Sequence, residues 1–154
     1  MKPLGSILRQ GVIVGSIGYV TIVLFFATLN LIAGRPFYFT AEVLGTALFG
    51  LAGAGAIIAA NGLHIVFTIV LATIATTAVW VVERQPVAWY IAYFTLLMAV
   101  VVGTVFLGLV ASQYAVATTW PGIAAANVLA TITMGATLWW MHPRLRAIMH
   151  AAPE

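Results

Sequence analysis

Residues 11–33 read GVIVGSIGYVTIVLFFATLNLIA, an uninterrupted apolar run that ends at Gly34-Arg35-Pro36. About 20 apolar residues are enough to cross the hydrocarbon core of a bilayer as an α-helix. Gly permits a left-handed cap and Pro cannot continue a helix, so this triplet predicts the end of the helix. The run is too long for the core of a secretory signal, and no small-x-small cleavage site follows it cleanly. We therefore expect an uncleaved first span over 7–33.

The composition of the whole chain supports a membrane protein. Of 154 residues, 64% are hydrophobic and 6% are charged, whereas about a quarter of the residues in a soluble domain are charged. The sequence contains no cluster of Lys and Arg that could bind successive phosphates of a nucleic-acid backbone, so we expect no nucleic-acid partner. Cysteine is absent, which excludes disulfides and thiolate chemistry.

Three later apolar segments are also long enough to cross, and we predict them at about 63–82, 87–116 and 122–141. Residues 143–154 form a short basic tail that we expect on the inner surface. Residues 41–60 are ambiguous, because they are apolar but contain four glycines that weaken a helix. Thr40 is predicted to cap the helix that starts there.

The basic residues decide between the alternatives for 41–60. If this segment crossed, there would be five spans, and most Arg residues would face outward. If it is interfacial or re-entrant, there are four spans, and five of six basic residues face the cytoplasm, as the positive-inside rule favours. These are Lys2, Arg9, Arg84, Arg144 and Arg146. We predict an all-α integral membrane protein of one domain, a bundle of four transmembrane helices with both termini in the cytoplasm.

The positions of the aromatic residues agree with this topology, because Trp and Tyr favour the two membrane interfaces. The predicted inner boundary contains Trp80, Trp89, Tyr90, Trp139 and Trp140, and the outer boundary contains Tyr38, Tyr114 and Trp120. The turn at 34–36, the aromatic residues after it and Leu44-Gly45 resemble segments of small bacterial membrane proteins. That resemblance implies a bacterial cytoplasmic membrane and no particular activity.

Small residues recur four positions apart on several predicted spans, a spacing that lets helix backbones approach closely in lipid. The pairs are Gly11/Gly15, Ala99/Gly103, Ala111/Ala115 and Ala126/Ala130. Two interpretations remain open: packing within this bundle, and packing against another membrane subunit. The pairs are more numerous than one four-helix bundle can bury, which favours a partner for some of them.

Few side chains could carry chemistry. His64, predicted near the outer end of the second span, could ligate a haem or chlorophyll or bond to a quinone. The alternative is a histidine bonded to a loop carbonyl. For His142 and His150 in the inner tail we expect a solvated or headgroup-facing position.

The charged residues are equally sparse. Glu42 is a candidate for an ion pathway because acids within a membrane are often functional, but Arg35 is near enough in sequence to pair with it. Arg144 and Arg146 are expected to contact lipid phosphates or an acidic partner surface. Threonines at 68, 73, 76 and 77 and at 131, 133 and 137 could line a polar seam with Asn127, although Thr usually bonds back to its own helix.

Enzyme motifs are missing from the sequence: there is no His-Glu-x-x-His, no phosphate loop and no pair of carboxylates. We expect a non-catalytic accessory subunit of a larger membrane complex, with photosynthetic and respiratory electron-transfer assemblies as the first to examine. Its expected partners are other integral membrane subunits and lipids. The alternatives are a small homo-oligomeric transporter or channel that uses Glu42, and a pigment- or haem-binding protein that uses His64.

Overall fold

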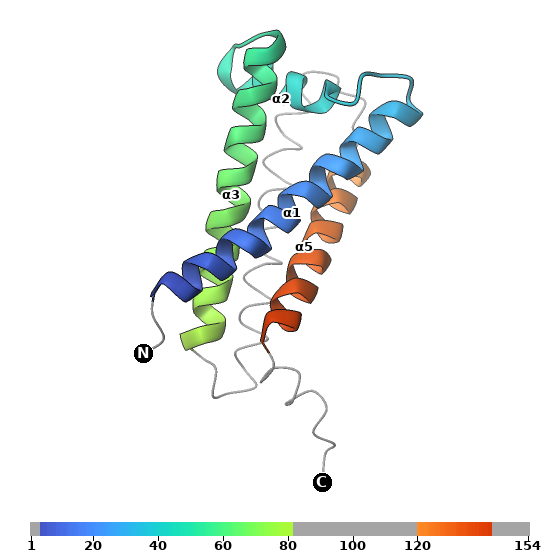
Figure 1. The fold of residues 1–154 in the computed structure, drawn as a ribbon. Coiled ribbons are helices and arrows are strands. Elements are labelled where there is room, and N and C mark those ends of the chain that lie inside the picture. The colour runs from blue at the N-terminus through green and yellow to red at the C-terminus, as the bar shows by residue number, and fades with distance from the viewer. Residues whose placement is uncertain (1–3, 82–119, 143–154) are drawn as a thin grey trace.

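The computed structural model describes residues 4–81 and 120–142, and these form four α-helices (Figure 1). They are α1 (Leu4–Ile32), α2 (Phe39–Phe49), α3 (Gly53–Val81) and α5 (Trp120–Met141). The described part is all-α, as predicted. Helices α1 and α3 are long and apolar enough to cross a membrane. The predicted span 87–116, with Ala99, Gly103, Ala111 and Ala115, and the tail with Arg144, Arg146 and His150 lie outside the described residues.

Helix α1 ends where the sequence predicts. Gly34 takes the left-handed conformation, with a φ of 68°. The N–H of Arg35 donates to the carbonyl oxygen of Asn30 at 2.8 Å, and the N–H of Gly34 donates to that of Leu31 at 3.0 Å. A left-handed glycine lets the chain reverse and satisfy the last carbonyls of the helix. The predicted helix end at Gly34 is therefore confirmed.

The ambiguous segment 41–60 is divided between two helices. Helix α2 ends at Gly50, whose φ is 66°, and α3 begins at Gly53, whose φ is 55°. The eleven residues of α2 span roughly 16 Å, about half the hydrocarbon thickness. Helix α2 is therefore too short to cross a bilayer by itself, and it lies over the end of the bundle (Figure 1). The residues from 53 to 60 extend α3, which begins well before the predicted start at 63.

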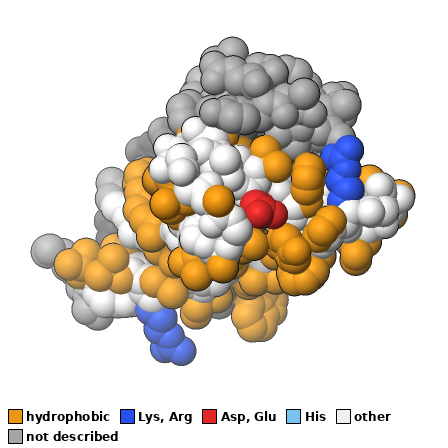
Figure 2. All heavy atoms as spheres, turned by 90° about the horizontal axis from the view of Figure 1, so that it is seen from above, with side chains coloured by type: hydrophobic (Ala, Val, Ile, Leu, Met, Phe, Trp, Pro, Cys, Tyr) orange, Lys and Arg blue, Asp and Glu red, His pale blue; other side chains and the backbone are white. Residues whose placement is uncertain are grey.

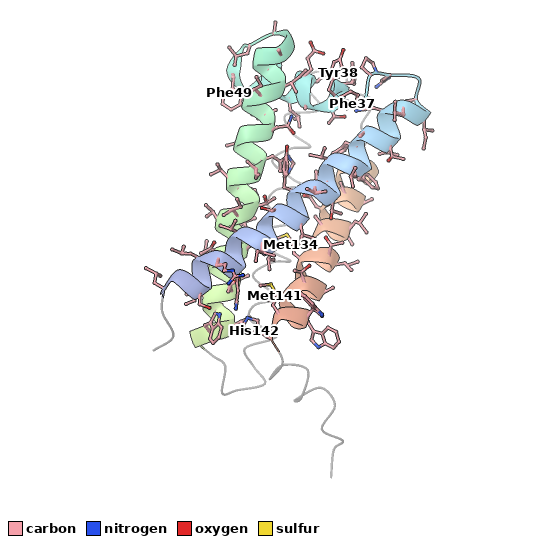
Figure 3. All side chains as sticks on the ribbon, viewed as in Figure 1. Phe37, Tyr38, Phe49, Met134, Met141 and His142 are labelled. Atoms are coloured by element: carbon pink, nitrogen blue, oxygen red, sulfur yellow. The ribbon has the colours of Figure 1, made fainter. Side chains whose placement is uncertain are left out.

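Helix α1 holds the described part together, because it packs against both α3 and α5, while α2 packs mainly on α3. One face of α1 is buried, at the three- and four-residue spacing of a helix: Gly11, Val14, Gly15, Gly18, Ile22, Phe26 and Asn30. A first core cluster joins Val14 to residues of α3 and α5, including Met134 (Figure 3). A second joins Ile22 and Phe26 to α5.

This core covers little of the apolar surface. In the most apolar stretch of α1, 22% of the residues are buried inside the chain, and in that of α3, 17%. Large hydrophobic side chains point outward along each long helix, such as Leu24 on α1, Val66 on α3 and Ile132 on α5. The helices therefore present apolar faces that the described residues do not cover.

Candidate functional site

Gly11 and Gly15 lie where α1 crosses α3. A Cβ added to Gly11 would lie 2.8 Å from the Cα of Thr73, and one added to Gly15 would lie 2.7 Å from the backbone nitrogen of Ile69. These distances leave no room for a side chain, so the close approach of the two backbones requires glycine. For this pair, the structure shows packing within the chain.

Ala126 and Ala130 are also used inside the bundle. Both are buried in the cluster with Ile22 and Phe26 of α1. Their small side chains let α5 lie close to α1. Of the small-residue pairs in the described ranges, neither is left for another subunit.

His64 belongs to a polar cluster between α1 and α3, which we call the Tyr19 cluster: Tyr19, Asn61 and His64. The hydroxyl of Tyr19 donates to Oδ1 of Asn61 at 3.0 Å, and Nδ2 of Asn61 donates to the Ile57 carbonyl oxygen at 2.8 Å. The His64 ring meets the Tyr19 ring edge-on, with 6.3 Å between centroids. Asn61 and His64 are one turn apart on α3, so both reach Tyr19.

The position of His64 differs from the prediction. Because α3 begins at Gly53, His64 lies roughly 16 Å along the helix, deeper than the outer end where the sequence placed it. It lies inside α3. Within residues 4–81 and 120–142, no hydrogen bond involves the His64 ring. Sequence reasoning missed Tyr19 and Asn61, because nothing in the pattern relates α1 to this turn of α3.

Glu42 lies in the first turn of α2, where the helix dipole favours a carboxylate. The guanidinium carbon of Arg35 lies 4.8 Å from the centre of the Phe39 ring. No ion pair joins Arg35 to Glu42 in the described part of the chain, so the expectation of that pair is wrong, and a cation–π contact takes its place. Figure 2, which views this end, shows a small acidic patch among hydrophobic side chains.

A buried pair of polar side chains joins the end of α1 to α2. Nδ2 of Asn30 donates to Oγ1 of Thr40 at 3.0 Å and to the carbonyl oxygen of Phe37 at 3.1 Å. The Thr40 hydroxyl donates back to Oδ1 of Asn30 at 3.2 Å. Helix α2 follows Tyr38 and has no side-chain cap. The prediction that Thr40 caps it is wrong, because Thr40 lies inside the helix and its hydroxyl bonds to Asn30.

The threonines of α3 and α5 behave as the simpler interpretation predicts. Every one of those predicted to form a seam donates to a carbonyl oxygen three or four residues earlier in its own helix. The prediction that they bond back is confirmed. Among the described residues, one hydroxyl pair connects helices: Thr21 of α1 and Thr133 of α5, with 3.1 Å between the oxygens. It stabilises the α1–α5 contact and does not link α3 to α5.

A second polar cluster lies at the opposite end from α2, and we call it the Gln10 cluster: Gln10, Trp80 and His142. The indole N–H of Trp80 donates to Oε1 of Gln10 at 3.0 Å, and Nε2 of His142 lies 2.8 Å from the same oxygen. The rings of Trp80 and His142 pack edge-on, with 4.9 Å between centroids. An amide oxygen can only accept, so His142 carries its proton on Nε2.

His142 is thus a packing residue, 3% exposed, at the end of α5 (Figure 3). The expectation that it is solvated or faces headgroups is wrong, because Gln10 and Trp80 enclose it. Sequence reasoning missed Gln10 altogether. The available signal was a lone amide at the start of an apolar helix, which needs a partner if the helix end is buried.

The described residues contain no group of three or more His, Asp or Glu that could hold a metal ion. The two polar clusters and the Asn30–Thr40 pair each join helices of the same chain. Among the members of the two clusters, only the His64 ring has no hydrogen-bond partner in the described ranges, and outside the clusters the indole N–H of Trp139 on α5 is buried without one. Comparison of the chain with protein-family models, curated proteins and solved structures finds no match.

Proposed function

We propose that this chain is a four-span protein of the bacterial cytoplasmic membrane, with both termini in the cytoplasm, and that it acts as a non-catalytic accessory subunit of a larger membrane complex. The supporting observation is that α1 and α3 are apolar but mostly unburied within the chain. A core helix of a soluble domain would have its apolar side chains covered. Such exposed apolar faces are suited to contact with lipid or with other membrane helices.

One face of α3 suits a protein neighbour. A Cβ added to Gly55 or Gly62 would meet no atom within 4 Å. These glycines are two helical turns apart, and Ile58 between them is exposed. Since Gly11 and Gly15 are used inside the bundle, the Gly55/Gly62 face replaces them as the candidate contact with another subunit. Photosynthetic and respiratory assemblies are the first complexes to examine, because they often contain small helical subunits.

Extraction in a mild detergent, followed by mass spectrometry of co-purifying proteins, tests this proposal. Wild-type protein should be isolated with larger membrane subunits. Gly62→Leu should lose them and keep its own fold, since the position is open in the chain, whereas Gly15→Leu should lose the fold as well. A protein that purifies alone under the mildest conditions would contradict the proposal.

A hydrophobic cofactor at His64 is the second candidate, favoured by the Tyr19 cluster. Its imidazole lacks a hydrogen-bond partner in the described ranges, and an unpaired polar group in hydrocarbon is costly. A haem or chlorophyll would give an absorption band that His64→Leu removes and His142→Gln keeps. The transporter alternative has less support, because the threonines bond back to their helices and Glu42 lies at the end of the bundle.

A further inference from the structure

We propose that α2 and the residues flanking it form a lipid anchor that lies in the headgroup layer of the outer leaflet. The anchor surface consists of Phe37, Tyr38, Phe49 and Leu51, which are exposed large side chains. This inference rests on the membrane placement proposed above and adds a role for the one helix that is too short to cross.

The depth of this surface follows from the long helices. Each of α1 and α3 has 29 residues, or about 43 Å, close to the thickness of a bilayer with its headgroups. Helix α1 ends and α3 begins at the same end of the bundle, and α2 lies across that end (Figure 1). A bilayer that covers α1 and α3 therefore has its headgroup layer at the level of α2.

The side chains of the anchor surface suit that layer. Tyr carries a polar hydroxyl on an apolar ring and concentrates at the interface between hydrocarbon and water. Phe and Leu are the apolar side chains by which interfacial helices enter the boundary between headgroups and acyl chains. Phe37 and Tyr38 lie before α2 and Phe49 at its end, so the aromatic contacts are on both sides of the short helix (Figure 3). Phe37 is 62% exposed and Phe49 46% exposed, which is unfavourable in water. Arg35 adds a cation near the phosphates.

The anchor is attached firmly to both long helices. The Asn30–Thr40 hydrogen bonds connect the start of α2 to α1. Gly45 lies against α3, where a Cβ would be 2.6 Å from the Cα of Ala56. Helix α2 cannot therefore shift in depth without moving α1 and α3. Anchoring α2 in the headgroups would fix the depth of both helices.

Site-directed spin labelling tests the anchor directly, because the chain contains no cysteine. Single variants Phe37→Cys, Phe49→Cys and, near the middle of α3, Val66→Cys would each carry a nitroxide in liposomes of phosphatidylethanolamine and phosphatidylglycerol. Collision rates with oxygen and with a water-soluble nickel chelate report depth. The anchor predicts headgroup depth for Phe37 and Phe49 and hydrocarbon depth for Val66.

The other outcomes separate the anchor from the membrane placement. Labels at Phe37 and Phe49 in bulk water, with Val66 in hydrocarbon, would overturn the anchor alone. If the labels at Phe37 and Phe49 were shielded from both reagents, another protein would cover α2. If they lay at hydrocarbon depth, α2 would belong to a re-entrant segment. Either result would also overturn the anchor. Water access at all three positions would overturn the membrane placement itself.

A double variant tests the role in setting depth. Phe37→Ser with Phe49→Ser should shift the Val66 label measurably toward one surface, because α2 loses its aromatic contacts. Phe37→Trp with Phe49→Trp is the matched control and should leave the depth unchanged. All four changes are at exposed positions, so the fold should persist. An unchanged depth in the Ser variant would show that α2 does not set it.

Discussion

Gln10 and His142 are 132 positions apart in the sequence, and Oε1 of Gln10 lies 2.8 Å from Nε2 of His142. The indole of Trp80 donates to the same oxygen. One amide thus joins an end of α1, an end of α3 and the residue after α5. A buried donor without an acceptor is costly, so this oxygen favours one arrangement of the three helix ends.

Gln10→Leu should destabilise the fold by about 1–3 kcal/mol, because the Trp80 indole loses its acceptor and the His142 imidazole loses a contact. Unfolding in mixed detergent micelles, monitored by circular dichroism, would measure this change in the free energy of unfolding. Arg9→Gln is the matched control on the neighbouring exposed residue and should change stability by under about 0.5 kcal/mol. Equal stabilities for the two variants would contradict a structural role for the cluster.

Gly15→Ala should destabilise the fold by about 1–3 kcal/mol, since its Cβ would overlap the α3 backbone at Ile69. Gly62→Ala should instead be neutral or stabilise by up to about 1 kcal/mol, because Ala favours a helix and the site is open. The same unfolding assay compares them. A reversed order would show that α1 and α3 do not cross at Gly15.

Thr40→Val should cost about 1–3 kcal/mol, because the buried Asn30 amide loses a hydrogen-bond partner. Thr46→Val makes the same chemical change on the same helix, but the Thr46 hydroxyl is exposed and only bonds back to the Glu42 carbonyl oxygen. Its effect should be under about 0.5 kcal/mol. Thermal unfolding in detergent would measure both, and a similar loss for the two variants would argue against the link between α1 and α2.

Arg144→Glu combined with Arg146→Glu should lower correct insertion, because in the proposed topology these charges help retain the C-terminal end in the cytoplasm. Protease protection of a C-terminal tag in inverted vesicles would measure the fraction inserted correctly. The matched control is Arg144→Lys combined with Arg146→Lys, which keeps both positive charges and should insert normally. Normal insertion of the Glu pair would show that other residues determine orientation.

The sequence predicts α1 well because its apolar run is bounded by a local signal, the turn at Gly34. It does not predict how 41–60 divides, because all four glycines look alike in sequence. Gly50 and Gly53 take positive φ, whereas Gly45 remains helical and packs on Ala56. That distinction depends on tertiary contacts.

The polar residues show the same limit. The sequence predicts a solvated His142 because a basic tail with Arg144 and Arg146 follows it, whereas its structural neighbours come from α1 and α3. The threonines were predicted correctly because their bonds are local, three or four residues back. Long-range pairs such as Asn61 with Tyr19 have no local pattern, so the sequence could not have identified them.

The central claim is the four-span membrane topology, and fusions of alkaline phosphatase and green fluorescent protein test it most directly. Alkaline phosphatase is active only in the periplasm, and the fluorescent protein folds in the cytoplasm. For reporters fused after Glu154, this topology predicts fluorescence without phosphatase activity. For reporters fused after Pro36, it predicts phosphatase activity without fluorescence. Phosphatase activity after Glu154, with the Pro36 fusion also periplasmic, would mean an odd number of spans and would contradict it.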